Sequence, residues 1–204
     1  MPSKLFQNDL PADIKIEGSL AIDTETRGLN IFGRDRLCVV QIGDNKGNAY
    51  LVQFKNSEYD KAVNLKALLA DNTRLKIFHY GRFDIAAIKI FLGVDIKNVF
   101  CTKISSRLVR TYTDKHGLKE LVKEFLDIDL SKQSQSSDWA GELSDKQIDY
   151  AASDVLYLHR LHDKLYKMLK DEGRVELAQK CFDFLPTRVE LDRAGWLDDD
   201  IFAH

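Results

Sequence analysis

Apolar residues group into three short runs in the first quarter of the chain. Residues 19–26, 37–44 and 48–54 read "SLAIDTET", "LCVVQIGD" and "NAYLVQF", and all three are rich in Val, Ile, Leu or aromatic residues. Turns that contain Gly and Asn separate them, as is typical of strands joined by short links. The pattern predicts an antiparallel meander of three strands that starts a mixed sheet.

The spacing of apolar residues then changes to a helical period. "LKALLADN" predicts a helix ending near Asn72, and "LKIFHY" at 75–80 predicts a short strand. "RFDIAAIKIFLG" predicts an amphipathic helix that Gly93 ends. The helical pattern continues through "VFCTKISSRLVR" and "GLKELVKEFLD", and the polar segment 131–142 predicts a loop.

The last third of the chain predicts two helices. Ser144 with Gln147 three residues later forms a capping box, which favours one helix from about Asp145 to Asp171. A second helix is expected over 174–193, before the acidic "WLDDD". Strands followed by a helical half, without a repeat or linker, predict a single α/β layered domain over residues 1–204.

Two carboxylates interrupt the first predicted strand. Asp23 and Glu25 are two residues apart, so they lie on the same face of a strand. One interpretation is a surface edge strand with two solvated acids. The preceding "LAI" and the apolar second and third strands favour a central strand instead. Buried carboxylates lose hydration and repel each other unless cations compensate.

Two further acids belong to other predicted elements. Asp84 stands in "FHYGRFDIAAI", where a strand gives way to a helix. Asp154 stands in "YAASDVLYLH", one helical turn after Tyr150. Taken singly, each is typical of a cap or a surface residue. Four acids converging from three elements would instead form a hard-oxygen site suited to Mg²⁺ or Mn²⁺.

In this order, "DTET", "HYGRFD" and "YAASD" resemble the motifs of the DEDD superfamily of 3′→5′ exonucleases, in its ribonuclease D branch. The resemblance covers about residues 15–170, and a tyrosine four residues before the last aspartate resembles the tyrosine subclass. It implies a ribonuclease H-like fold, a mixed sheet flanked by helices. The motifs supply Asp23, Glu25, His79, Asp84, Tyr150 and Asp154.

The resemblance also implies a mechanism. Two divalent ions, Mg²⁺ or Mn²⁺, about 3.5–4 Å apart would stabilise the attacking and leaving oxygens of phosphodiester hydrolysis. By analogy, Asp23 binds both ions, Glu25 and Asp154 hold the ion that carries the attacking water, and Asp84 supports the second. Tyr150 would orient that water, while its reference pKa near ~10 leaves most of the deprotonation to the metal. The products would be nucleoside 5′-monophosphates.

Five residues are expected to bind the substrate: Thr24, Thr26, Leu29, His79 and Lys132. Leu29 either wedges between the last two bases or covers the core as a turn hydrophobe. His79 either contacts the substrate phosphate or orders the strand end. Lys132 either neutralises the scissile phosphate or is solvated.

A few other residues have both a functional and an ordinary interpretation. Lys103, Arg107 and Arg110 recur at helical spacing and either face a nucleic-acid backbone or form a solvated helix face. Trp139 either anchors packing or stacks on a base. His159 and His162 are three residues apart but lack a third nearby ligand, so packing or surface histidines are favoured over a metal site.

Composition narrows the class of protein. The net charge of −2 provides no general polycationic surface, so a nucleic-acid partner would need a local basic strip or metal ions. Cys38, Cys101 and Cys181 are far apart and predict reduced thiols. The N-terminus lacks a signal pattern, and no apolar run approaches the ~18 residues of a membrane span. We expect a cytoplasmic protein without membrane contact.

The sequence departs from the ribonuclease D pattern in its polar loop. Many relatives carry an Arg near Ser136 and an Arg-Pro pair near Gly141–Glu142, and their absence leaves RNA against DNA preference open. Ribonuclease D enzymes also carry helical nucleic-acid-binding domains after the catalytic one. This chain predicts a catalytic domain alone, with 174–204 as a terminal helical cap.

The favoured function is a metal-dependent 3′→5′ exonuclease, in particular an exoribonuclease, acting on single-stranded RNA or DNA ends without an obligate protein partner. Two other functions remain open. One is a catalytically inactive nucleic-acid-binding or scaffold protein of the same fold. The other is a metal-dependent endonuclease or other phosphodiesterase.

Overall fold

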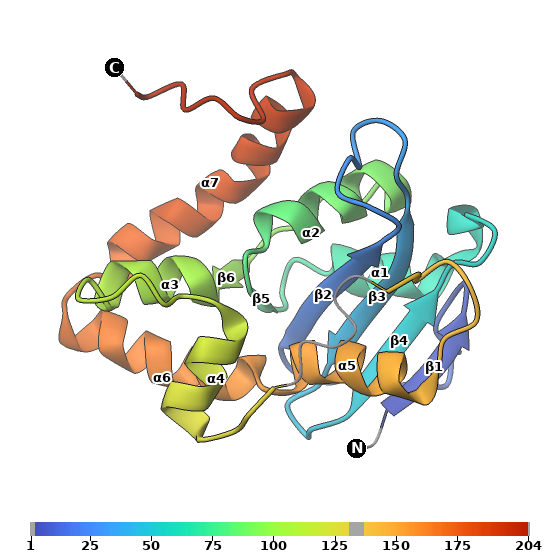
Figure 1. Ribbon diagram of the computed structural model, residues 1–204, viewed down its shortest axis with the longest axis horizontal. Coiled ribbons are helices and arrows are strands. Elements are labelled where there is room, and N and C mark those ends of the chain that lie inside the picture. Colours follow the sequence, from blue (N-terminus) through green and yellow to red (C-terminus); the bar gives the residue numbers. More distant parts are fainter. Residues whose placement is uncertain (1–2, 131–136, 204) are drawn as a thin grey trace.

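A six-stranded mixed sheet forms the centre of the computed structural model, which describes residues 3–130 and 137–203. The strand order is β1-β4-β3-β2-β5-β6 (Figure 1). The strands are β1 (Ser3–Gln7), β2 (Leu20–Thr26), β3 (Leu37–Gly43), β4 (Ala49–Gln53), β5 (Lys76–Phe78) and β6 (Val99–Cys101).

The predicted meander is confirmed, and it places β2 inside the sheet. β2 pairs antiparallel with β3, and β3 with β4, with Asp23 opposite Gln41. On its other side β2 pairs parallel with β5. The acids of β2 therefore lie on a central strand, which excludes the interpretation of a solvated edge strand.

Two strands of the sheet differ from the sequence-based expectation. β1 extends the sheet by pairing parallel with β4, so the sheet begins before residue 19. Residues 99–101, expected to be helical, form β6 and pair parallel with β5. Three apolar residues are too few to separate a strand from the first turn of a helix by periodicity alone.

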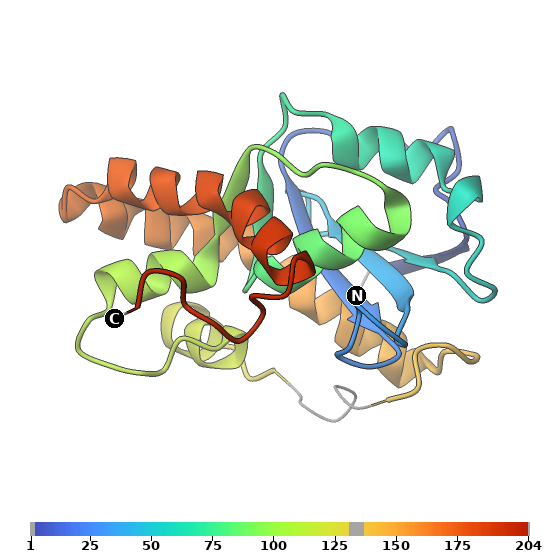
Figure 2. The same cartoon turned by 90° about the horizontal axis from the view of Figure 1, so that it is seen from above.

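Helices cover both faces of the sheet. α1 and α2 lie on one face and α5 on the other, as the view from above shows (Figure 2). α3, α4, α6 and α7 gather beyond the β6 edge. The helical segments are η1 (Tyr59–Lys61), α1 (Val63–Ala70), α2 (Arg82–Ala87), the π-helical η2 (Ile88–Leu92), α3 (Thr102–Val109), α4 (Leu118–Leu126), α5 (Asp145–Leu156), α6 (Leu158–Asp171) and α7 (Val175–Arg193).

Most predicted helix ends are confirmed. Ser144 and Gln147 form both hydrogen bonds of a capping box at the start of α5. Gly93 ends η2 with a φ of +69°, a backbone conformation that favours glycine. The prediction of a single helix from 145 to 171 is wrong, because the helix is interrupted at Tyr157. α5 packs across β1–β4, whereas α6 packs on α3 and β5, and one straight helix does not reach both surfaces.

The core follows from this layering. Every residue of β3 and β4 is buried, because helices cover the two faces of the central strands. Burying one Leu or Val side chain contributes about 1.5–3 kcal/mol to folding. Within the described residues, none of the helices has the length and apolar character needed to cross a membrane.

Candidate active site

Three carboxylates meet where β2 faces α5. Asp23 and Glu25 share a face of β2, and Asp154 projects from the third turn of α5. One oxygen from each of the three residues lies within 4.8 Å of the others. The sequence-based prediction that these acids converge is confirmed for this group of three.

Asp84 reaches the same place from the first turn of α2. The residue is 4% exposed, and the Oγ1 of Thr24 donates a hydrogen bond to its Oδ1 at 2.6 Å. The charge of Asp84 raises the pKa of Asp23, so the two groups interact although Asp84 lies outside the tight group of three. Four acids from three elements thus surround one site.

Burial and mutual repulsion disfavour the ionised forms of these acids and raise their pKa values. Burial raises the pKa of Asp23 well above its usual range, and repulsion from Asp84 and Asp154 raises it further. Burial, then repulsion from Asp154, raises the pKa of Glu25 to about 9. Burial also raises the pKa values of Asp84 and Asp154 to about 7.

The site has the character of a cation-binding site. Over residues 3–130 and 137–203, no Lys or Arg forms an ion pair with any of the four carboxylates. Buried carboxylates without a counter-charge are strongly disfavoured. Clustered carboxylate oxygens are the ligands of hard divalent ions, so the residues present fit the metal ions that the motifs imply.

Tyr150 places a hydroxyl beside the acids. It lies one turn before Asp154 on α5, close enough for the two groups to shift each other's pKa. Burial, followed by the charges of Asp154 and Glu25, raises the pKa of Tyr150, so its hydroxyl keeps its proton at neutral pH. The buried ring of Trp139 packs against Tyr150 at 6.0 Å between centroids. This supports the packing interpretation of Trp139.

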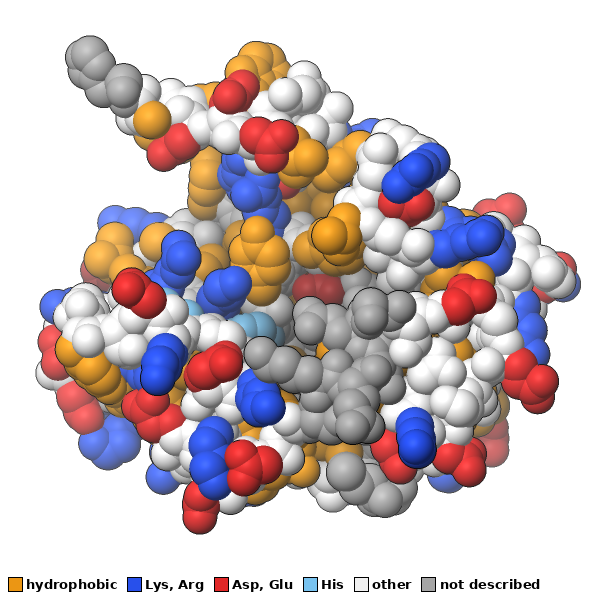
Figure 3. All heavy atoms as spheres, viewed as in Figure 1, with side chains coloured by type: hydrophobic (Ala, Val, Ile, Leu, Met, Phe, Trp, Pro, Cys, Tyr) orange, Lys and Arg blue, Asp and Glu red, His pale blue; other side chains and the backbone are white. Residues whose placement is uncertain are grey.

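The acids lie in a cavity of about 750 Å³. In the space-filling view, acidic side chains lie deep in a hollow near the centre of the face (Figure 3). The cavity brings together residues of β2, α2, α3, α4 and α5. Among the predicted substrate-binding residues, its lining includes Thr24, Thr26, Leu29 and His79. Lys132 lies outside the described residues.

Leu29 stands on the wall of the cavity with 84% of its surface exposed. This exposure excludes the interpretation that it covers the core, and its contact with a base stays a prediction. The hydroxyls of the two threonines are already engaged within the protein, because Thr24 donates to Asp84 and Thr26 to the carbonyl of Gly28 at 2.5 Å. Their contact with substrate also stays a prediction.

His79 is held at the end of β5. Thr102 Oγ1 donates its one proton to the carbonyl of Phe78 at 3.1 Å and lies 2.9 Å from Nδ1 of His79. With that proton on the Phe78 carbonyl, the hydroxyl accepts from Nδ1–H, and His79 is then the tautomer with a free Nε2. Burial lowers the pKa of His79 to about 3, so the ring is neutral. The hydrogen bond supports the role of ordering the strand end, and Nε2 of this tautomer is an acceptor.

The predicted basic face of α3 is only partly formed. Lys103 lines the cavity, with its Nζ 4.2 Å from the ring centroid of Tyr80, and Arg107 is exposed. Arg110 is 1% exposed and pairs with Glu124, so both interpretations, a contact with nucleic acid and a solvated helix face, are wrong for this residue. Helical spacing placed it with the others, but it follows the last residue of α3 and turns into the protein.

The remaining predictions concern histidines and the polar loop. His159 lies 3.2 Å from the carbonyl of Ser19, and the His162 ring packs between Phe100 and Tyr166. The interpretation of His159 and His162 as packing histidines is confirmed.

In the polar loop, the carbonyl of Gly141 accepts a hydrogen bond from Gln53 Nε2 at 2.7 Å, which connects the loop to β4.

Tyr80 is a cavity residue that the sequence analysis missed. Its backbone has a φ of +64°, and its ring is half exposed on the cavity wall. A non-glycine residue in this conformation costs on the order of 1 kcal/mol and is often found at functional sites. The "HYG" turn signals a bend, but it does not reveal where the ring points.

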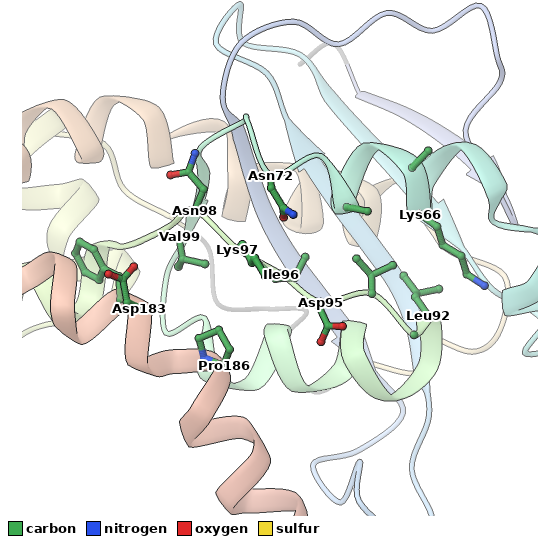
Figure 4. Close-up of a pocket in the computed structure, with 15 residues that line it drawn as sticks. Lys66, Asn72, Leu92, Asp95, Ile96, Lys97, Asn98, Val99, Asp183 and Pro186 are labelled. Atoms are coloured by element: carbon green, nitrogen blue, oxygen red, sulfur yellow. The ribbon is translucent and has the colours of Figure 1, made fainter.

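A second cavity of about 960 Å³ lies between α1, the segment after η2 and α7 (Figure 4). Its acids, Asp95 and Asp183, stand on separate elements, and much of its lining is apolar, including Leu92, Ile96 and Pro186. Size alone would select this cavity. The clustered carboxylates select the smaller one as the candidate active site.

Comparison with known proteins identifies the family to which the chain belongs. A family model described as 3′-5′ exonuclease matches residues 5–170. The chain is 35% identical to DNA polymerase I of Aquifex aeolicus over 171 residues, covering 83% of this chain and 27% of that protein. It is 32% identical to ribonuclease D of Sphingobium indicum over 156 residues, covering 76% of this chain and 39% of that protein. The chain therefore spans well under half the length of these relatives.

A solved structure of Brucella melitensis NrnC resembles the whole chain. It is 53% identical, each chain is covered completely, and the TM-score is 0.93. The same protein has been solved with bound Mg²⁺ and bound to pGG. The expected ribonuclease H-like arrangement of a mixed sheet flanked by helices is confirmed.

Proposed function

Because the chain belongs to the 3′-5′ exonuclease family of the DEDD superfamily, we propose that it removes nucleoside 5′-monophosphates from the 3′ ends of single-stranded nucleic acid. The observation that carries this proposal is the meeting of Asp23, Glu25, Asp84 and Asp154 in one cavity without a compensating cation among the described residues. Members of this family depend on divalent metal, and the site has the ligands for it.

The carboxylates would hold two divalent ions, Mg²⁺ or Mn²⁺. Asp23, Glu25 and Asp154 supply the close group of oxygens, and Asp84 supplies the fourth carboxylate, with one oxygen already bound by Thr24. When bound, such ions activate water and stabilise charge on the attacking and leaving oxygens of a phosphodiester. The cost of bringing four acids together is then offset by the ions.

Tyr150 would orient the attacking water. Its hydroxyl keeps its proton because burial and the neighbouring carboxylates raise its pKa. A protonated phenol donates a hydrogen bond and does not act as a general base. Tyr150 therefore has a positioning role in the reaction.

The substrate would contact the residues that line the cavity around the acids. Lys103, stacked on Tyr80, provides a positive charge near the acids and would contact a phosphate. His79 is neutral, and its Nε2 accepts hydrogen bonds, which suits a sugar hydroxyl better than a phosphate. Leu29 would pack against the terminal bases.

We expect short RNA to be a substrate. NrnC, 53% identical over its whole length, has been solved bound to pGG. The cavity of about 750 Å³ is open to solvent, and its size suits a few nucleotides. The substrates that the full-length curated relatives process do not carry over to this chain, since it covers only a part of their length.

A ladder assay tests the proposal. Labelled RNA and DNA, single- and double-stranded and from two to about twenty nucleotides long, are incubated with Mg²⁺, Mn²⁺ or EDTA. We expect stepwise shortening from the 3′ end, with metal, and mononucleotide products. Asp154→Asn serves as the inactive control.

Three outcomes would overturn the proposal. Cleavage of a circular substrate would indicate an endonuclease. Binding without cleavage in every metal would indicate an inactive nucleic-acid-binding protein. Cleavage that Asp154→Asn leaves unchanged would place the activity elsewhere.

A further inference from the structure

The start of α2 is held by α7, a helix that lies beyond the residues matched by the family model. Arg82 is the first residue of α2. Its Nε donates to Oδ2 of Asp192 at 2.7 Å, and its Nη2 donates to Oδ1 at 2.6 Å. A guanidinium that engages both oxygens of a carboxylate forms the strongest and most directional type of ion pair. α2 and α7 also pack against each other (Figure 1).

Asp192 is buried and has a second arginine partner. Arg188 approaches Oδ1 of Asp192 at 3.2 Å from one turn earlier on α7. The same two arginines bind carbonyls of the segment after α7: Arg82 donates to Leu197 at 2.6 Å, and Arg188 to Trp196 at 2.8 Å. The end of α7 and the following residues thus bind the Arg82 guanidinium, whose side chain is 26% exposed.

A positive charge at the first residue of α2 needs compensation. The first turn of a helix carries partial positive charge from its free N–H groups, so a cation there is unfavourable. Asp192 supplies the missing negative charge from a residue 110 positions away. The arrangement is therefore specified by tertiary contacts and is not a local preference of the α2 sequence.

Asp84 lies two residues after Arg82 and is held from the other side. Thr24 of β2 donates to its carboxyl at 2.6 Å. The first turn of α2 is thus fixed between β2, which carries Asp23 and Glu25, and α7. A shift of α2 relative to β2 would change the distance between Asp84 and the other acids.

Resting on the proposed function, we infer that Arg82 and Asp192 are positioning residues, which set Asp84 for metal binding through the contact of α7 with α2. In this view α7 is a working part of the catalytic unit and not an appended cap. Partners outside the direct ligand set commonly change metal affinity or activity by about 10- to 100-fold when they are removed.

The test compares metal binding with substrate binding in Asp192→Asn, which keeps the side-chain shape and removes the charge. We expect the half-saturating Mg²⁺ concentration for cleavage to rise about tenfold. Mn²⁺ affinity measured by calorimetry should fall by a similar factor. The KM for a labelled oligonucleotide at saturating Mg²⁺ should change less than about twofold, since the pair does not line the acidic cavity.

Three further variants sharpen the test. Arg82→Lys keeps the charge but not the two-pronged contact, so it should show an intermediate effect. The effect of the double variant Arg82→Gln with Asp192→Asn on Mg²⁺ dependence should be smaller than the sum of the two single effects, because both changes remove the Arg82–Asp192 pair. Glu190→Gln is the matched control, since Glu190 forms an exposed pair with Arg193 on the same helix and should retain normal Mg²⁺ dependence.

Unchanged Mn²⁺ affinity and Mg²⁺ dependence in Asp192→Asn would overturn the inference. A lower melting temperature with normal metal affinity would overturn it as well, since that pattern indicates a structural role only. If the unaltered protein binds Mn²⁺ but cleaves nothing, the proposed function fails, while calorimetry on the variants still decides the positioning role.

Discussion

Two buried clusters of charge in this protein are built in opposite ways. In the cluster at the end of α7, Asp192 is bound by Arg82 and Arg188. In the cavity, Asp23 and its neighbouring acids have no such ion pair within the described part of the chain, and burial, followed by repulsion from Asp84 and Asp154, raises the pKa of Asp23. Both clusters place carboxyls below the protein surface, but within the described residues only one contains its own counter-charges.

The difference separates a structural charge from a functional one. A buried carboxylate that is paired and hydrogen-bonded is satisfied within the fold. A buried carboxylate without a partner is costly and marks a site that a ligand completes. The cavity is therefore incomplete without cations, whereas the Asp192 cluster is complete.

The largest expected effect is that neutralising an acid changes the free energy of unfolding in opposite directions in the two clusters. Without metal at pH 8, Asp23→Asn should raise the free energy of unfolding by about 1 kcal/mol, because it removes repulsion between buried acids. Asp192→Asn should lower it by about 2–3 kcal/mol, because two arginines lose their charged partner. Urea unfolding in EDTA measures both. Cleavage should also fall about a thousandfold or more in Asp23→Asn, a loss of ~4 kcal/mol.

If both variants lowered stability equally, the contrast between the two clusters would be wrong. If the slope of the free energy of unfolding against urea concentration is the same in both variants, the unfolded state has not changed.

The second prediction concerns pH without metal. The pKa values of Asp84 and Asp154 are near 7 in the fold and near ~3.9 in the unfolded chain, so the folded protein holds protons that the unfolded chain has lost. The contribution of these two groups to the free energy of unfolding should be complete below about pH 4. It should be lost as pH rises through about 7. Each such group contributes a slope of about 1.4 kcal/mol per pH unit.

Melting temperatures in EDTA and in Mg²⁺, from pH 5 to pH 8, test this. Mg²⁺ should stabilise the protein more at pH 8 than at pH 5, and Asp154→Asn should flatten the decline in EDTA. A melting temperature in EDTA that rises from pH 5 to pH 8 would contradict the assignment of raised pKa values.

The third prediction separates the metal ligands from Tyr150. Tyr150→Phe removes one hydroxyl, which lies beside Asp154 and would hydrogen-bond to the attacking water. Losing a hydrogen bond to a charged group costs about 1.5–3 kcal/mol, so kcat should fall about 10- to 100-fold. Mn²⁺ affinity measured by calorimetry should stay within about twofold. A large loss of Mn²⁺ affinity would assign Tyr150 to the metal site instead of to the water.

The smallest expected effect is at Leu29. Because its side chain is exposed, Leu29→Ala should leave the melting temperature unchanged. If it packs on the terminal bases, the KM for a short oligonucleotide should rise about fivefold, which corresponds to ~1 kcal/mol of lost apolar contact. Val63→Ala, also exposed but on α1, is the control. Equal KM values in both variants would exclude the wedge.

The fold was predictable where local periodicity is distinctive. The apolar runs of β2 to β4 and the capping box at Ser144 each depend on a few neighbouring residues, and both are confirmed. β6 and the break at Tyr157 were not predictable, because their backbone conformations depend on what they pack against. Arg110 shows the same limit at the level of side chains, since helical spacing does not show that Glu124 draws it inward.

By itself, the sequence determined that acids of the right type and order interrupt apolar segments, and hence which residues were candidates for metal ligands. Only the tertiary structure decided which charges are paired. Thr24 reaches Asp84 across 60 positions and Arg82 reaches Asp192 across 110. The physical reason is that the cost of a buried charge depends on the distance to its partner in space, which spacing along the chain does not specify.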